Sequence, residues 1–387
     1  MVAVTESFDL AQILFDLAAI LVVAKLAAEL AERLRIPAVI GEIAAGMLIG
    51  PHVIGLAQTG DVTYVISEIG VVLLLLHVGM EMDLGELRKV GRSSLGVAGL
   101  GVVIPMLAGI ATGLALGKSG DTSLFIGAAM TATSVGITAR VLGDMNALSR
   151  PESRIVLGAA VADDILGLLL LTVVTRVVEK GDVNFADVGT TIGTALLFLV
   201  VAGAAAVFVL PQVFDLIEGI STSTSSMPIV AVGTTFCFAA LAVESNLAPI
   251  IGAFVAGLAV SRCKSHEKVE REIDSIASFF IPVFFVGIGM NTDLGLLAHW
   301  DVIAPALLLS VVAVIGKAIA SLGATGSGTD RMLVGIGMIP RGEVGLIFAT
   351  IGLSVGAFND EMHAVVLLVV LITTLITPPL LRWRIAK

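Results

Sequence analysis

Long apolar runs alternate with short polar segments along the whole chain. Most runs have the length of a membrane-crossing helix, because about 20 residues at about 1.5 Å each cover a hydrocarbon core of about 30 Å. Each predicted boundary is good to about two to four residues. The alternation predicts thirteen spans, near residues 10–34, 37–56, 62–82, 95–117, 121–143, 155–178, 186–210, 226–243, 247–261, 272–291, 302–325, 331–356 and 361–381. The pattern therefore indicates an all-α polytopic membrane protein.

Composition agrees with this fold class. Of the 387 residues, 57% are hydrophobic and 14% are charged, which lies far outside the range of soluble domains. The 42 glycines, one tyrosine and two tryptophans suit closely packed helices and argue against a β-barrel girdled by aromatic residues. The net charge is −10 and no basic stripe alternates with aromatic residues, so nothing indicates a nucleic-acid partner. The acidic N-terminal segment lacks the basic region and cleavage site of a signal peptide, and we expect it to form the first span.

Basic residues are distributed unevenly between the two sides of this topology. Sixteen of the 22 Lys and Arg residues fall in alternate connecting segments or at the span ends that border them, which would all face the same side of the membrane. Cytoplasmic loops retain an excess of Lys and Arg. We therefore predict that the N-terminus lies outside and the C-terminus lies in the cytoplasm.

Two pairs of similar segments indicate an internal repeat. VGMEMDLGEL at 78–87 matches IGMNTDLGLL at 288–297, and AVIGEIAAGML at 38–48 matches PIIGAFVAGLA at 249–259. The repeats would be six spans each, at 1–180 and 226–387, joined by a linker helix at 186–210. Corresponding helices then lie seven spans apart and must point in opposite directions. Inverted repeats are a transporter architecture, with the substrate site near the midplane at the repeat interface.

Residues that interrupt a helix occupy matching positions in the two repeats, within 121–143 and 331–356. Three hydroxyl residues weaken the first helix, while a proline removes a backbone donor from the second and a glycine adds conformational freedom. They are Thr131, Thr133, Ser134, Pro340 and Gly342. These positions predict two broken helices near the midplane. Helices that are kinked but continuous are the alternative.

Two adjacent aspartates, Asp163 and Asp164, are the only charged residues between positions 155 and 175. Each ionised aspartate at a bilayer centre costs about 2.5 to 3.5 kcal/mol, so the pair favours a site for cations or protons over a purely structural ion pair. Counted from the predicted cytoplasmic ends, Asp163 and Lys317 both lie about 12 Å deep and can pair. Adjacent helical residues point about 100° apart, so one aspartate can face Lys317 and the other a water-filled cavity. Either assignment is open.

The first predicted break can complete a cation site beside these carboxylates. An acid poised near physiological pH can exchange a proton for a cation, and Na+ prefers hard oxygen ligands. The freed carbonyls and hydroxyls of a broken helix are such ligands. The candidate ligands for Na+ are Asp163, Asp164, Thr131, Thr133 and Ser134.

Further ionisable residues lie within the predicted spans. Arg341 and Glu343 flank the second break, where we expect them to neutralise the ends of half-helices and to pair locally rather than to contact the ion. Glu68 is a candidate for the route that ions take to the site. His77 and Lys25 lie near span ends or grooves, and we expect them to be structural.

Five motifs together resemble a known family. They are IPAVIGEIAAGMLIGP at Ile36–Pro51, TATSVGITARVL at Thr131–Leu142, LGAAVADDILGLL at Leu157–Leu169, GKAIA at Gly316–Ala320 and IPRGEVGLI at Ile339–Ile347. The combination is similar to the second family of monovalent cation/proton antiporters, and most of all to its bacterial Na+/H+ antiporter branch.

The resemblance implies a thirteen-helix fold with two broken helices that cross near the midplane, in which both repeats contribute to a core domain and a dimerisation domain. It implies that Asp164 carries the ion and that Asp163 is the partner of Lys317. A paired aspartate in this family implies electrogenic exchange of two protons for one Na+. It also implies a homodimer in the cytoplasmic membrane of a prokaryote, with no cofactor besides the transported ions.

The sequence thus predicts a secondary active Na+/H+ antiporter rather than an enzyme. The alternatives within transport are K+/H+ exchange, with Li+ as a further candidate cation, and Na+-coupled uptake of an organic solute. The K+ efflux systems carry a cytoplasmic regulatory domain, which is missing from this sequence. Intramembrane aspartyl proteases are disfavoured, because their two catalytic acids come from different helices and flank a peptide bond.

Overall fold

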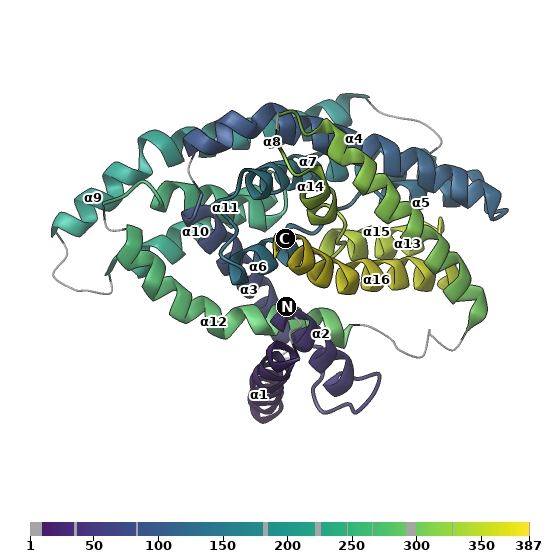
Figure 1. Cartoon of the computed structure of the whole chain (residues 1–387), viewed down its shortest axis with the longest axis horizontal. Helices are drawn as coiled ribbons and strands as arrows, with labels where there is room; N and C mark the ends of the chain where they lie inside the picture. Colours follow the sequence, from purple (N-terminus) through teal and green to yellow (C-terminus); the bar gives the residue numbers. More distant parts are fainter. Residues whose placement is uncertain are drawn as a thin grey trace, which may run out of the picture. The chain divides into compact units, whose positions relative to one another are not determined.

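The computed structural model describes residues 10–34, 37–82, 84–180, 185–220, 226–245, 247–264, 266–291, 299–326 and 328–386. Every regular element in these ranges is helical (Figure 1), which confirms the all-α fold class. Each of the thirteen predicted ranges contains at least part of a helix. Among the described helices, eight are long and apolar enough to cross a membrane alone, and nine if a bent pair counts as one span. The number thirteen stays a prediction.

The bent pair consists of α8 (Phe185–Phe208) and α9 (Leu210–Ile220), which meet at an angle of 41°. The hydropathy pattern ends a span near residue 210 and does not predict α9. Polar residues interrupt the apolar run in this segment, and one of them, Asp215, accepts a hydrogen bond of 3.2 Å from the backbone of Lys264. Because polar residues interrupt the apolar run, hydropathy alone does not predict this helix.

The chain forms two compact units, Met1–Val71 with Ser275–Gly295 and Val72–Asp274 with Leu296–Lys387. In the first unit, α1 (Leu10–Arg33) packs on α2 (Ala38–Ile49), and the second half of α12 (His266–Met290) completes a small apolar core. Small residues allow this packing, because a Cβ on Gly46 would overlap the Val286 carbonyl. The boundary between the units falls within α3 (Asp61–Met80) and within α12.

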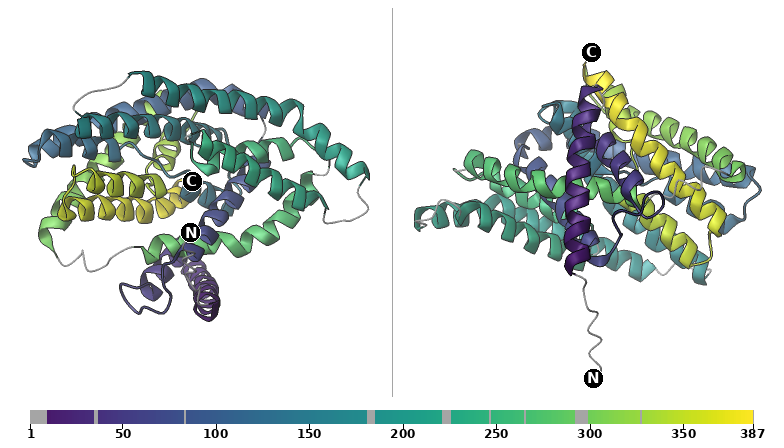
Figure 2. Two further views of the ribbon diagram at one scale, coloured as in Figure 1. Left: turned by 180° about the vertical axis from the view of Figure 1, so that it is seen from behind. Right: turned by 90° about the horizontal axis from the view of Figure 1, so that it is seen from below.

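The second unit is built around α4 (Leu84–Ala115), which packs against α7 (Pro151–Lys180), α5 (Gly120–Ala129) and α13 (Trp300–Ala320). The C-terminal helix α16 (Asp360–Ile385) lies beside α13, α14 (Arg331–Gly337) and α15 (Glu343–Ser354), as Figures 1 and 2 show. Two further helices, α10 (Ser226–Glu244) and α11 (Pro249–Val260), pack on each other and on α8 and α9.

Both predicted helix breaks are present, so the alternative of kinked continuous helices is wrong. The first span divides into α5, which ends at Ala129, and α6 (Val135–Asp144). The second divides into α14, which ends at Gly337, and α15, which begins at Glu343. Hydroxyl groups that bond locally compete with helix hydrogen bonds, and proline lacks a backbone donor, which explains both positions.

The repeat assignment stays a prediction. Its best-matching segments include Asp83 and residues 292–298, which lie outside the described residues. The linker at 186–210, the inverted orientation of the two repeats and the division into core and dimerisation domains are likewise expectations from the sequence.

Candidate functional site

The two helix breaks lie against each other inside the second unit. The backbone nitrogen of Ser134 donates a hydrogen bond of 2.7 Å to the Pro340 carbonyl, which joins one break to the other. Gly342 permits this approach, because a Cβ at that position would lie 2.6 Å from the Ser134 hydroxyl oxygen. Three of the predicted break residues therefore form the junction itself.

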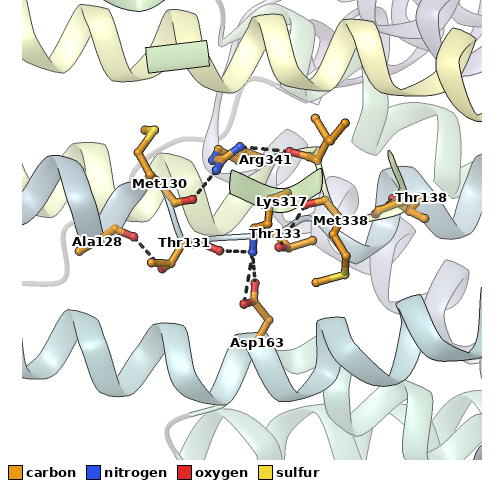
Figure 3. A network of polar contacts seen from close by, with 11 residues as sticks. Ala128, Met130, Thr131, Thr133, Thr138, Asp163, Lys317, Met338 and Arg341 are labelled. Carbon is orange, nitrogen blue, oxygen red and sulfur yellow. Dashed lines mark hydrogen bonds and ion pairs between the residues drawn. The ribbon is translucent and has the colours of Figure 1, made fainter. Parts of the chain in front are cut away.

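Hydroxyl groups from the first break and from the start of α6 satisfy the carbonyl end of α14. The Thr138 hydroxyl donates to the Gly337 carbonyl at 2.7 Å, and the Thr133 hydroxyl donates to the Met338 carbonyl at 3.5 Å (Figure 3). The last carbonyls of a helix have no partner within the helix and need one from elsewhere when they are buried. The fully buried Thr138 was not singled out in the sequence. A signal was present, since it lies one helical turn after Ser134 on the same face.

Two buried cations face the carbonyl end of α5. The Lys317 ammonium donates to the Thr131 carbonyl at 2.6 Å, and the Arg341 guanidinium donates through Nη2 to the Met130 carbonyl and through Nη1 to Ile339 at 3.1 Å (Figure 3). A helix C-terminus carries about half a negative charge, so cations stabilise it. Arg341 thus lies at the carbonyl end of α5, a half-helix of the first break, although it comes from the second break.

Asp163, on α7, pairs with Lys317. The Lys317 Nζ lies 3.4 Å from both carboxylate oxygens, and the two side chains are 1% and 0% exposed (Figure 3). The Thr133 hydroxyl neighbours the same carboxylate. Of the two arrangements that the sequence left open, the structure has the one in which Asp163 faces Lys317. Gly101 on α4 leaves room for the ammonium, since a Cβ there would lie 3.3 Å from Nζ.

Asp164, the next residue of α7, is also buried close to this ion pair. Only 4% of the residue is exposed, and its charge acts on Lys317 as a second, weaker partner. Adjacent residues on a helix point about 100° apart, so the two carboxylates present separate surfaces. The second unit therefore brings together two carboxylates, two cations and the polar groups of two helix breaks. Such a set of hard oxygen atoms around ionisable acids can bind protons or a small monovalent cation.

Two predicted residues are not part of this cluster as described. Glu343 begins α15, and its side chain lies outside the described residues. Glu68 is half-buried on the segment of α3 that belongs to the first unit, so its predicted place on the ion route stays a prediction.

Comparison with known proteins gives consistent matches over nearly the whole chain. A family model described as sodium/hydrogen exchanger, transmembrane, matches residues 18–384. The high-affinity Na+/H+ antiporter NhaS3 of Synechocystis sp. is 34% identical over an alignment of 414 positions, gaps included, which spans 96% of this chain and 90% of that protein. The Na+/H+-K+ antiporter GerN of Bacillus cereus is 36% identical over 380 residues, 95% of each chain.

A solved structure shares the fold. The sodium proton antiporter MjNhaP1 from Methanocaldococcus jannaschii superposes with a TM-score of 0.69 and 17% sequence identity, over 95% of each chain. At this identity the similarity concerns the arrangement of the helices alone.

Proposed function

We propose that this chain, which belongs to the sodium/hydrogen exchanger family, is a secondary active Na+/H+ antiporter. In this proposal Na+ and H+ compete for one buried carboxylate. The family resemblance seen in the sequence is confirmed, and it identifies a multi-pass membrane antiporter of a family of transporters rather than enzymes. Competition for one carboxylate would couple the two ion gradients, because the site can carry Na+ or a proton but not both at once.

The observation that carries the mechanism is the Asp163–Lys317 ion pair at the junction of the two broken helices. Asp163 has the buried ammonium as its counter-ion at 3.4 Å, so we assign Asp164 as the carboxylate for which Na+ and H+ compete. Asp164 would face a water-filled cavity when it exchanges its ion. This division of roles gives the two adjacent acids different functions, although both are aspartates in the same helix turn.

Oxygen atoms of the first break complete the Na+ site in this proposal. The side chains of Thr131, Thr133 and Ser134 are buried between α5 and α6, and the Thr133 hydroxyl neighbours the Asp163 carboxylate. A hydroxyl that donates its proton keeps lone pairs for a cation, as the Thr131 hydroxyl does when it donates to the Ala128 carbonyl at 2.7 Å. Asp163 contributes negative charge to the site, and the positive charge of Lys317 offsets part of it.

We further propose that transport is electrogenic, with two protons exchanged for each Na+. Moving one net charge through 100 mV is worth about 2.3 kcal/mol. That free energy sustains a Na+ gradient of about fiftyfold, because each factor of ten corresponds to about 1.4 kcal/mol. The protein would work by alternating access as a homodimer in the cytoplasmic membrane of a prokaryote. Its N-terminus would lie outside and its C-terminus in the cytoplasm.

Transport by purified protein in liposomes that contain a pH dye tests the assignment of Asp164. An outward or inward Na+ gradient should change the internal pH with wild-type protein, and Asp164→Asn should abolish the change. Asp16→Asn is the matched control, because Asp16 is also a buried aspartate in an apolar helix, where it accepts a hydrogen bond of 2.8 Å from Gln12. It should transport normally. The proposal would be overturned if Asp164→Asn exchanged Na+ for H+ at the wild-type rate, or if the internal pH did not respond to Na+ with wild-type protein.

K+/H+ exchange is the second candidate. It is favoured by one relative, since the protein GerN, 36% identical, is named for K+ as well as Na+. The same liposomes with Na+, Li+ or K+ as the only cation, and with the membrane potential set and then clamped, separate the candidates. A response to K+ that equals the response to Na+ would make the protein a less selective exchanger, and a rate independent of the potential would contradict electrogenic exchange.

A further inference from the structure

A second group of ionisable side chains lies apart from the proposed ion site, also within the second unit. His77 occupies the last turn of α3, Glu81 follows the end of that helix, and Glu270 and Asp274 lie one turn apart near the start of α12. One ligand atom from each of His77, Glu81 and Glu270 lies within 4.8 Å of the other two. We call these four residues the α3–α12 cluster. The proposed antiport mechanism uses none of them.

The imidazole in the α3–α12 cluster is held by carboxylates at both ring nitrogens. The His77 Nε2 lies 2.9 Å from the Glu81 Oε1, and the Nδ1 lies 2.8 Å from the Asp274 Oδ1. Metal-binding histidines commonly have one ring nitrogen on a carboxylate, which orients the ring so that the other nitrogen faces the metal. Asp274 is in position to orient the ring, and this leaves the Nε2, Glu81 and Glu270 as a set of metal ligands.

The spacing of these residues along the helices supports the same interpretation. His77 and Glu81 are four residues apart, and on α12 His266, Glu270 and Asp274 follow one another at intervals of four. Residues four apart share one face of a helix, which is the spacing that helical zinc motifs use. The charge of His266 acts on Glu270, so a second imidazole lies near the cluster on the same helix.

Charge and accessibility also suit a cation. Three carboxylates surround His77, so their mutual repulsion falls when a positive ion joins them. The side chains of His77 and Asp274 are 20% and 50% exposed, which gives an ion access from solvent. Zinc binds imidazole nitrogen and carboxylate oxygen at about 2.0 to 2.2 Å, which separates tetrahedral ligands by about 3.4 Å. Small side-chain rotations are enough to bring atoms within 4.8 Å to that separation.

We propose that the α3–α12 cluster binds one divalent transition-metal cation of the Zn2+ type and that the bound ion fastens the end of α3 to the start of α12. Mixed imidazole and carboxylate ligands favour Zn2+ and its neighbours in the transition series, whereas Mg2+ and Ca2+ prefer oxygen alone. His77, Glu81 and Glu270 bind the ion directly, His266 is the candidate fourth ligand, and Asp274 orients His77. Both helices continue into the first unit, so the ion would restrain two of the segments that join the units.

Binding of Zn2+ to the purified, metal-free, full-length protein tests this site. Isothermal titration should give one Zn2+ per chain, and Co2+ should give a visible absorption spectrum typical of tetrahedral coordination. His77→Ala and Glu270→Gln should each lower the Zn2+ affinity by more than tenfold. Asp274→Asn should lower it by about tenfold, as the loss of an orienting carboxylate does. Zn2+ should raise the melting temperature of the wild type only, because a ligand that binds the folded state stabilises it.

The matched control is His299→Ala, which removes an exposed histidine at the start of α13. It should bind Zn2+ with wild-type affinity, and the melting temperatures without metal should show that each variant is folded. The proposal is overturned if wild-type protein binds Zn2+ no more tightly than His77→Ala, or if His299→Ala loses as much affinity. None of these measurements depends on transport, so they remain informative whatever the transport assays show.

Discussion

The replacement of Lys317 by methionine removes the positive charge from the buried ion pair and keeps a side chain of similar length. The ammonium that is lost lies 3.4 Å from both Asp163 oxygens and 2.6 Å from the Thr131 carbonyl, and it has no exposed surface. The variant therefore leaves a buried carboxylate without its counter-ion, and a helix-end carbonyl without its donor. We expect Lys317→Met to be strongly destabilising.

The size of the effect can be worked out from the geometry. Two unit charges 3.4 Å apart attract by about 5 kcal/mol at an effective dielectric constant of about 20. In the intact pair, the desolvation cost of the two ions offsets most of this attraction. When one ion is removed, the remaining ion keeps its desolvation cost and loses the attraction. Removal of one partner from a buried pair costs about 3 to 5 kcal/mol. Asp163→Asn should cost less than Lys317→Met, because Lys317 would retain its hydrogen bond to the Thr131 carbonyl.

A double-mutant cycle measures the coupling between the two residues. The free energy of unfolding is determined in mixed micelles for the wild type, Lys317→Met, Asp163→Asn and the double variant. The double variant contains neither charge, so it should be more stable than the sum of the single effects predicts, by about 0.5 to 3 kcal/mol. Lys268→Met, which changes an exposed lysine in the first turn of α12 and outside the predicted spans, is the control and should change stability by less than about 0.5 kcal/mol. Additive single effects, or a cost below about 1 kcal/mol for Lys317→Met, would refute this reasoning.

Two further changes test the junction and the end of α16. Gly342→Ala places a Cβ 2.6 Å from the Ser134 hydroxyl oxygen, so it should cost about 1 to 3 kcal/mol in denaturation experiments and slow Na+-driven pH change in liposomes. Near Asp330, partial burial raises the carboxyl pKa, but hydrogen bonds from Arg384 at 2.7 Å and from the Leu333 backbone at 3.1 Å lower it below its ordinary value of 3.8. A carboxyl group whose pKa is lower in the folded than in the unfolded protein stabilises the fold at pH values above its unfolded pKa. That stabilisation is lost as the pH falls through the lower, folded-state pKa. Melting temperatures between about pH 5 and pH 2 should therefore fall less steeply for Arg384→Ala than for wild type, and equal slopes would contradict this assignment.

Several features of the site could be predicted from the sequence because they depend on residue type and depth alone. Pro340 and the hydroxyl residues from Thr131 to Ser134 mark the two breaks, since each weakens helix hydrogen bonding wherever the helix packs. The approach of Asp163 to Lys317 is expected from equal depth on two spans. The family resemblance rests on these same residues.

Other features depend on packing or on the backbone, which the sequence does not display. The choice of Asp163 rather than Asp164 as the partner of Lys317 depends on the rotation of α7 about its axis, and contacts with neighbouring helices determine that rotation. The acceptors for the buried cations are the carbonyls of Met130 and Thr131, and every residue has a carbonyl. The number of spans is also poorly determined by hydropathy, because α2 and α11 are only 12 residues long.

The two cations at the end of α5 affect how transport measurements are interpreted. Lys317 has two contacts of different kinds, an ion pair with Asp163 and a hydrogen bond to the Thr131 carbonyl. Loss of transport in Lys317→Met would therefore have two explanations, a changed charge at the ion site or a displaced helix end. Asp163→Asn separates them, because it removes the ion pair and leaves the hydrogen bond to the carbonyl in place. If Asp163→Asn still exchanges Na+ for H+ but with a changed dependence on membrane potential, Asp163 determines the charge that moves in each cycle, and the main role of Lys317 is to hold the break together.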